Sequence, residues 1–355
     1  MNQSTVGQSS SLPWSFRLAE SSGVSLPLIS AGVFLAYFLI FFAYQNLTGG
    51  VAGLHMGARP FWSNPWGFSE LIYAALFAWV PPFVILVRRS ARRNQDLLQS
   101  SLNASATRSE WLGPVSTRYY RIAGIVGVGL ALVANVSFLR TVAGQQRPEA
   151  WEAWVVWMVV RDVVCAWLLW RAWAVALSVA IHFYRLADRD AVARLLNPRA
   201  LSPFVRLGFR LALLYCIGIA IGSPAFGLIP IAQAELFSSF APLILVALLF
   251  AALLLCLPCA GAYRAIAREK SVELERVRTE IERQRGMALS ADHESKTAAA
   301  GQLPGLLAYE ARVEKVREWP FGAFGLLRFL FYVAIPVGSW VASALVERLV
   351  TGALE

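Results

Sequence analysis

The sequence predicts an all-α protein: a polytopic transmembrane helix bundle of six or seven spans, with a cytoplasmic helical hairpin before the last span. The 355 residues are 57% hydrophobic and only 15% charged, whereas a soluble domain carries about a quarter charged residues. The apolar residues form blocks of about 18 or more with almost no charge, the length that a helix needs to cross a bilayer. A β-barrel is excluded because its strands would alternate apolar and polar residues.

Apolar segments divide the chain in order. Residues 1–24 are polar and Ser-rich, without the basic start and short apolar run of a secretory signal, so we expect a disordered tail. Six spans follow within 25–262, and 321–348 is expected to be a last transmembrane or re-entrant helix, interrupted by Arg328 and Pro336. The individual apolar segments are 25–47, 67–87, 122–140, 155–183, 207–229, 241–262 and 322–346.

The arginines predict the orientation, because positively charged loops stay in the cytoplasm. Segments 88–121, 184–206 and 263–320 hold seven, five and eleven basic residues. A cytoplasmic N-terminus places 24 basic residues inside and 4 outside. The chain is therefore expected to be a multi-pass protein of a bacterial inner membrane, with its C-terminus external.

Reporter fusions test this orientation directly. Fusions at Leu97 and Ala300 should report a cytoplasmic location, and fusions at Gly53 and Ala234 an external one. An external signal at Leu97 would contradict the orientation, because seven arginines would then have crossed the membrane.

The fourth segment is unusually long for a span. Residues 151–183 contain six of the thirteen tryptophans, and one helix of this length would measure about 50 Å. Either the span tilts strongly, or 150–160 is an interfacial helix that leads into a span starting near residue 162. Tryptophans at the beginning of the segment suit an aromatic belt at the outer interface.

Residues 263–320 predict a hairpin of two helical arms, 263–286 and 305–318, joined by a mobile, Ala/Gly-rich linker at 290–304. Charges four residues apart, Arg276 with Glu280 and Arg278 with Glu282, are expected to pair along the first arm. Each arm spans under two heptads, which is too short to predict an intermolecular coiled coil. A protein partner could bind at 263–318, because arms this short need packing to be stable. The apolar seams are Leu274, Val277 and Ile281 on the first arm, and Leu306, Leu307, Val313 and Val316 on the second.

The C-terminal stretch resembles that of a loose group of uncharacterised bacterial polytopic membrane proteins. The resemblance covers about the last 90 residues. It implies membrane localisation and no particular activity. The residues that carry it are Val316-Arg317-Glu318-Trp319-Pro320-Phe321, Arg328, Pro336, Gly338-Ser339-Trp340 and Glu347-Arg348.

Charges inside spans are candidate functional residues, because they are costly to place in a membrane. Arg161, Asp162 and Arg171 lie in the fourth segment, and Glu70 in the second is a possible partner. The alternative is a structural ion pair that fixes helix packing, with Arg171 extending toward the inner surface.

Prolines predict helix breaks that could expose carbonyls to an ion or a substrate. Pro81 and Pro82 lie in the second span, Pro224 lies in the fifth, and Pro336 lies in the last segment. Such kinks are also frequent in ordinary spanning helices.

A thiol pair and a basic cluster complete the candidates. Cys256 and Cys259 lie three apart on one helix, but no basic group beside them would stabilise a thiolate, so packing is the favoured interpretation. A cluster suited to anionic lipid headgroups follows the second span. Its members are Arg88, Arg89, Arg92 and Arg93.

Familiar chemistries find no support in the sequence. No span contains a lysine for a retinal Schiff base, and the three histidines are not placed to hold a haem. Neither a zinc-protease motif nor a P-loop is present. We therefore expect no catalytic residue, metal or cofactor, and no nucleic-acid partner. The favoured function is a non-enzymatic scaffold or sensor acting through the hairpin; the alternatives are a small-solute or ion transporter and, more remotely, a thiol-redox protein.

Overall fold

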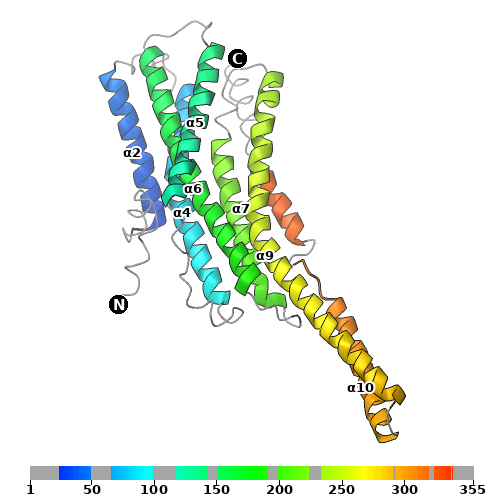
Figure 1. The fold of residues 1–355 in the computed structure, drawn as a ribbon. Helices are drawn as coiled ribbons and strands as arrows, with labels where there is room; N and C mark the ends of the chain where they lie inside the picture. Colours follow the sequence, from blue (N-terminus) through cyan, green and yellow to red (C-terminus); the bar gives the residue numbers. More distant parts are fainter. Residues whose placement is uncertain are drawn as a thin grey trace.

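The computed structural model describes residues 24–48, 65–98, 117–142, 151–190, 195, 198–223, 233–290, 293–319, 324–336 and 338. Within these ranges the chain is helical and contains no strand, as predicted (Figure 1). The helices are α2 (Leu26–Leu47), α4 (Pro65–Leu98), α5 (Thr117–Val142), α6 (Trp151–Asp190), the short 3-10 helix η5 (Pro198–Leu201), α7 (Ser202–Gly222), α9 (Gln233–Ser290), α10 (His293–Glu314) and a last helix, Phe324–Pro336.

Six of these helices are long and apolar enough to cross a membrane: α2, α4, α5, α6, α7 and α9. Large apolar side chains cover their outer surface, among them Leu39 (71% exposed) and Ile125 (70% exposed). A soluble protein would not expose apolar patches of this extent. The last helix is shorter, and apart from Gly338 the rest of the segment 321–348 lies outside the described residues, as does most of the predicted tail 1–24.

Two helices are continuous where the sequence suggested that they could be interrupted. α4 runs through Pro81 and Pro82 without a break, so the lost amide donors do not interrupt the helix. α6 is one continuous helix of 40 residues, about 60 Å long, so the interfacial helix considered for 150–160 is not separate. Both helices pack against neighbours along most of their length, and this packing overrides the local signals.

The core of the bundle lies among α4, α6, α7 and α9. α5 packs mainly on α6, and α2 mainly on α4, so both lie at the periphery (Figure 1). The largest fully buried side chains of this core include Phe183, Phe204, Leu207, Leu211 and Leu254.

Glycines allow α9 to approach its neighbours closely. A Cβ on Gly208 of α7 would lie 2.8 Å from the carbonyl oxygen of Leu255, and one on Gly261 of α9 would lie 2.7 Å from the carbonyl oxygen of Tyr184 in α6. No side chain fits in so narrow a space, so α9 is held between α6 and α7 just before its apolar stretch ends.

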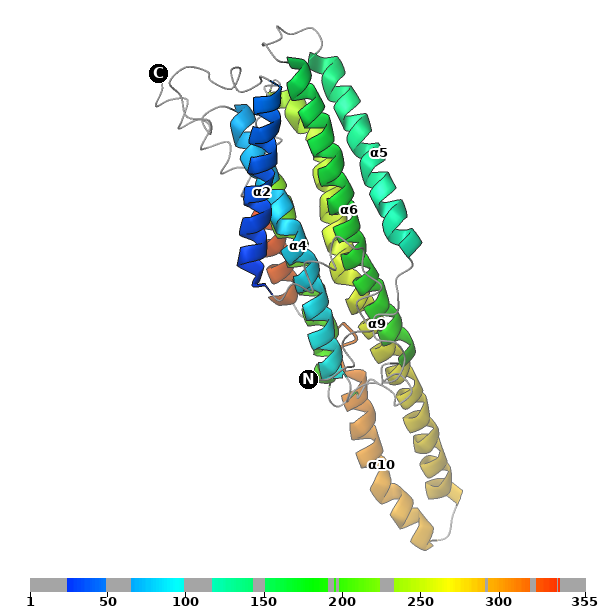
Figure 2. The same ribbon diagram turned by 90° about the vertical axis from the view of Figure 1, so that its left-hand side faces the viewer.

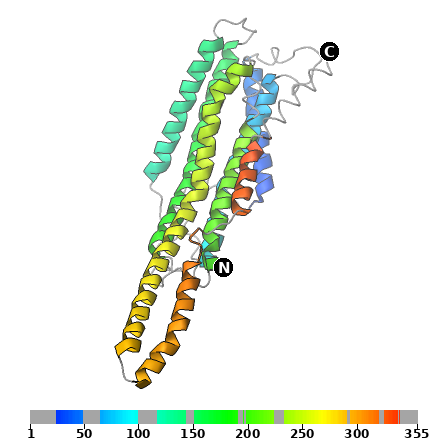
Figure 3. The same ribbon diagram turned by 90° about the vertical axis from the view of Figure 1, so that its right-hand side faces the viewer.

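α9 continues far beyond the bundle. It is a single helix of 58 residues, about 87 Å long, whose apolar part ends near residue 262. Its polar half protrudes from the arginine-rich end of the bundle, and α10 lies alongside it (Figures 2 and 3). The predicted hairpin is therefore present, and its first arm is the direct extension of a candidate span.

The boundaries of the hairpin differ from those predicted. The first arm ends at Ser290 instead of Gly286, and α10 begins at His293. The linker expected at 290–304 is therefore wrong in extent, because most of it is the first half of α10. An Ala/Gly-rich composition is typical of linkers, but alanine is also the strongest helix former, so the same residues continue a packed helix.

Ion pairs on the hairpin also differ from those predicted. Arg278 does not pair with Glu282; it reaches across to α10, with Nε 2.7 Å from Glu310 and Nη2 2.9 Å from Glu314. Arg276 pairs with Glu273 instead of Glu280. The cross-arm carboxylates are available to Arg278 because α10 packs antiparallel to α9, which local spacing does not reveal.

An apolar seam holds the two arms together, and it can be tested. Val313 of α10 is fully buried and Val277 of α9 is 5% exposed. Val313→Asp should separate the arms, because it places a charge in the seam, and hydrogen exchange of α10 should become fast. Arg278→Ala should change exchange little, because an exposed ion pair contributes about 1 kcal/mol or less. Equal effects of the two substitutions would contradict this account.

Candidate functional site

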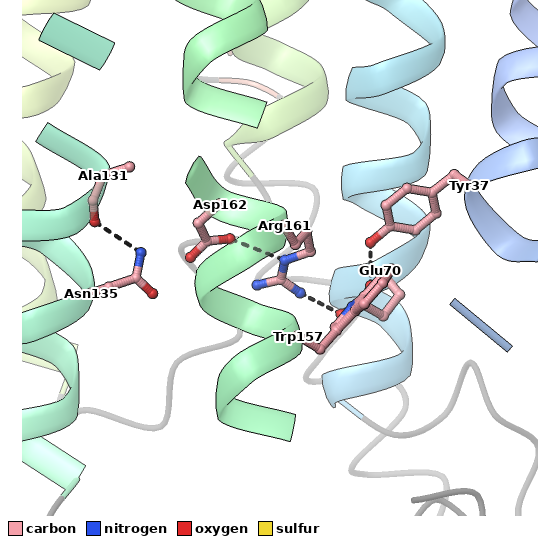
Figure 4. Close-up of polar contacts among 7 residues, drawn as sticks. All are labelled: Tyr37, Glu70, Ala131, Asn135, Trp157, Arg161 and Asp162. Carbon is pink, nitrogen blue, oxygen red and sulfur yellow. Dashed lines mark hydrogen bonds and ion pairs between the residues drawn. The ribbon is translucent and has the colours of Figure 1, made fainter. Parts of the chain in front are cut away.

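A buried ion pair connects two spans in the half of the bundle away from the hairpin. Glu70 of α4 is 2% exposed and Arg161 of α6 is 7% exposed. The Arg161 Nη1 donates to Glu70 Oε1, while the Tyr37 hydroxyl of α2 and the Trp157 indole of α6 donate to Oε2 (Figure 4). Three donors from two other helices thus satisfy both oxygens of one carboxylate.

Asp162 completes the cluster from the exposed side. Its Oδ1 lies 3.0 Å from Arg161 Nε, and its side chain is 21% exposed. The Arg161 guanidinium also stacks on the Tyr73 ring, 3.8 Å from its centroid. The cluster therefore contains two carboxylates and one guanidinium, with its charges hydrogen-bonded and packed against aromatic rings.

This geometry is suited to holding helices together. The cluster links α2, α4 and α6, which otherwise share mostly apolar contacts. The two oxygens of Glu70 are already occupied, so within the described residues it has little capacity to accept a substrate group. The sequence suggested the pairing of Glu70 with Arg161, but it held no signal for Tyr37, since a tyrosine in an apolar span has many other uses.

Arg171 lies apart from this cluster. It is 8% exposed, and its guanidinium stacks on the Trp167 ring at 4.3 Å. The close approach of α5 at Gly124 covers both side chains. Asn135 of α5 is a further buried polar residue that the sequence did not indicate; its amide donates to the Ala131 carbonyl at 2.8 Å (Figure 4).

The cysteine and proline candidates from the sequence do not form a common site in the described part of the chain. Cys256 is exposed at the bundle surface, whereas Cys259 is buried, and both are free thiols. Pro336 lies in helix, as the last residue of the described stretch Phe324–Pro336, and Pro224 lies outside the described residues, directly after α7 and its cap at Ser223.

The basic cluster after the second span is divided by the fold. α4 extends through it to Leu98. Arg88 is 6% exposed and lies within the bundle, so it is not placed to contact headgroups. Arg89, Arg92 and Arg93 are exposed, so these three side chains are accessible to anionic headgroups.

A second polar site joins α6 to the base of the hairpin. Arg264 of α9 donates to the Tyr184 hydroxyl, and Arg268 contacts the Asp188 carbonyl at 2.8 Å and its carboxylate at 3.0 Å. These arginines follow Gly261 on the same face of α9, so the close backbone contact and the polar contacts act together.

The return segment secures the other side of the base. Lys270 donates to the Val316 carbonyl at 3.1 Å and to Glu318 at 3.2 Å. The rings of Tyr263 and Trp319 lie 5.2 Å apart. The hairpin is thus held at its base by α6 on one side and by residues 316–319 on the other.

Charges along the hairpin reinforce its helices. Hydrogen bonds from Arg283 and Gln284 lower the pKa of Glu280 to about 2. The hydrogen bond and charge of Glu310, with those of Glu314, raise the pKa of Arg278. Glu280 and Arg278 therefore stay ionised near neutral pH, and their pairs persist there.

Fold and site together define the class: the chain is a polytopic helical membrane protein with a long helical hairpin projecting from one end. No protein-family model, curated protein or solved structure matches it.

Proposed function

We propose that this protein is a non-enzymatic membrane scaffold or sensor that acts through the hairpin formed by α9 and α10. The single observation that supports it most is the continuity of α9, which runs as one helix from an apolar span to the tip of the hairpin. A tether would need no such continuity, whereas a helix that is rigid across the membrane surface can hold a binding surface at a set distance and angle.

The contacts at the hairpin base support the same proposal. Gly261, Arg264 and Arg268 bind α9 to α6, which extends back to the buried Glu70–Arg161 pair. The polar part of α9 beyond residue 263 is about 40 Å long. The arginine distribution favours the cytoplasm as the compartment into which it projects, in an inner membrane.

Shortening the hairpin tests the proposal. Removing residues 276–311 and joining the ends with a short Gly-Ser linker deletes most of both arms but keeps Lys270, Val316 and every span. We expect the shortened protein to insert and unfold at the same temperature as the full chain. We also expect it to lose its complexes in native electrophoresis of solubilised membranes and to lose its cellular function.

Retention of both complexes and cellular function would show that the hairpin is only a tether. A transporter would instead keep solute uptake after shortening and lose it in Glu70→Gln or Asp162→Asn. Uptake into proteoliposomes by the full chain and these three variants separates the two outcomes.

A further inference from the structure

Arg171 places a positive charge near the middle of the membrane. Its guanidinium stacks on Trp167, which precedes it by about one turn of α6, on the side away from the hairpin. Trp167 lies about 24 Å along α6 from Trp151 at one end of the helix, and about 26 Å from Tyr184 at the hairpin base. The side chain is therefore directed toward the bilayer centre and does not extend toward the hairpin end of the bundle.

No group of the described helices neutralises this charge. Arg171 makes no hydrogen bond or ion pair with a residue that the structure describes; its Nε is fully buried, whereas its terminal nitrogens keep some exposure. The carboxylates of Glu70 and Asp162 both contact Arg161. Asp162 also lies about two and a half turns from Arg171, which places it on the opposite side of α6. Arg171 is thus a buried cation without a counter-ion among the described residues.

An exposed apolar stripe on α6 leads to this cation. Its residues follow one another at spacings of four, four, three and four, so they share one face of the helix. α2 packs on one side of the stripe at Trp157, and α5 packs on the other side at Ala166, as Figure 2 shows for the helices. The three valines of the stripe are 41–53% exposed. The stripe consists of Val156, Val160, Val164, Trp167 and Arg171.

The counter-ion of Arg171 has to reach the bilayer centre. Lipid headgroups stay at the membrane surface, about 15 Å away. A small anion would have to leave water, whereas a carboxylate on a spanning helix is carried to this depth when that helix inserts. The stripe offers such a helix an apolar surface that ends at a cation, so a membrane-spanning helix fits this face better than either alternative.

We propose that the stripe on α6 binds a transmembrane helix of another membrane protein, and that this helix carries an aspartate or glutamate near the middle of its span. Its apolar side chains pack along the three valines, and its carboxylate pairs with the Arg171 guanidinium beside Trp167. The pair is favoured because each charge is costly in the membrane without the other. The inference goes beyond the proposed function, because it places a protein partner within the membrane and away from the hairpin.

A designed transmembrane peptide tests the proposal. The probe is a spanning leucine-alanine helix with one glutamate at its centre, and the reference is the same helix with glutamine. Energy transfer between the labelled full chain and each labelled peptide, measured in liposomes at low peptide density, gives the strength of association. We expect the glutamate peptide to bind about tenfold more tightly than the glutamine peptide. Moving the glutamate two turns toward either end should remove most of this advantage, since the carboxylate then lies at a different depth from Arg171.

Variants of the chain assign the effect to this face. Arg171→Gln should abolish the preference for the glutamate peptide, and Arg171→Lys should keep part of it. Arg210→Gln should leave the preference intact, because Arg210 is an exposed cation on α7, away from the stripe. Val160→Trp should weaken binding by altering the stripe, whereas Val133→Trp, at an equally lipid-exposed valine of α5, should not.

The outcomes are decisive in both directions. Equal binding of the two central peptides, or a preference that persists in Arg171→Gln, overturns the proposal. Nitrate efflux from liposomes that depends on Arg171, without any peptide preference, would make a small anion the occupant and also overturn it. If Arg171→Gln fails to fold, the depth series on the wild-type chain and the two valine variants decide. The chain with the shortened hairpin should still prefer the glutamate peptide, so this inference and the scaffold proposal can fail separately.

Discussion

Replacing Glu70 by leucine is expected to lower the free energy of unfolding by about 3–5 kcal/mol. The substitution leaves the Arg161 guanidinium buried with only Asp162 as a counter-ion, and removes the acceptor of Tyr37 and Trp157. Unfolding in mixed detergent and SDS, followed by tryptophan fluorescence, measures the loss.

Two comparisons isolate the buried pair. Asp162→Asn should cost less, about 1 kcal/mol, because that carboxylate is partly exposed and keeps a hydrogen-bonding oxygen. The double variant Glu70→Leu with Arg161→Leu should be more stable than Glu70→Leu alone, because no buried charge is then left unpaired. Losses that simply add would show that the two side chains act independently.

Substitution of Gly261 by leucine is expected to have the second largest effect, a loss of about 3 kcal/mol. A Cβ at this position would lie 2.7 Å from the Tyr184 carbonyl oxygen and 2.8 Å from the Ala187 Cβ. The obstacle is largely backbone, so α9 must move away from α6. The Arg264 and Arg268 contacts with α6 should break as a result. Thermal unfolding in detergent and crosslinking between α6 and α9 measure both consequences.

A matched glycine provides the control. Gly129 lies in the middle of α5, and a Cβ added to it would meet no atom of another helix within 4 Å. Gly129→Ala should therefore be neutral or slightly stabilising, because alanine favours a helix over glycine by about 1 kcal/mol. A loss for Gly129→Ala comparable to that for Gly261→Leu would mean that glycine matters through backbone flexibility instead of close packing.

The identity of the spans follows from the sequence because hydropathy is a local property. A run of apolar residues is apolar whatever its neighbours are, so the six spans of the described chain could be predicted from composition alone. The same holds for the hairpin, where interleaved charge marks helices that leave the membrane. The intramembrane charges could also be found in this way, because any charge in such a segment is conspicuous.

Which charged side chains contact one another is not a local property, and only the tertiary structure decided it. Glu70 and Arg161 lie 91 residues apart, and their contact depends on the rotation of α4 and α6 about their axes. Arg278 has acidic neighbours on its own helix, yet it binds Glu310 because the antiparallel register brings that carboxylate closer.

The same reason explains the continuity of α4, α6 and α10. When only neighbouring residues are considered, the prolines and the Ala-rich stretch predict breaks, and the tryptophan run allows either one tilted helix or a separate interfacial helix. Contacts with other helices contribute more free energy than these local preferences, so packing along the bundle and the hairpin sustains each helix through them.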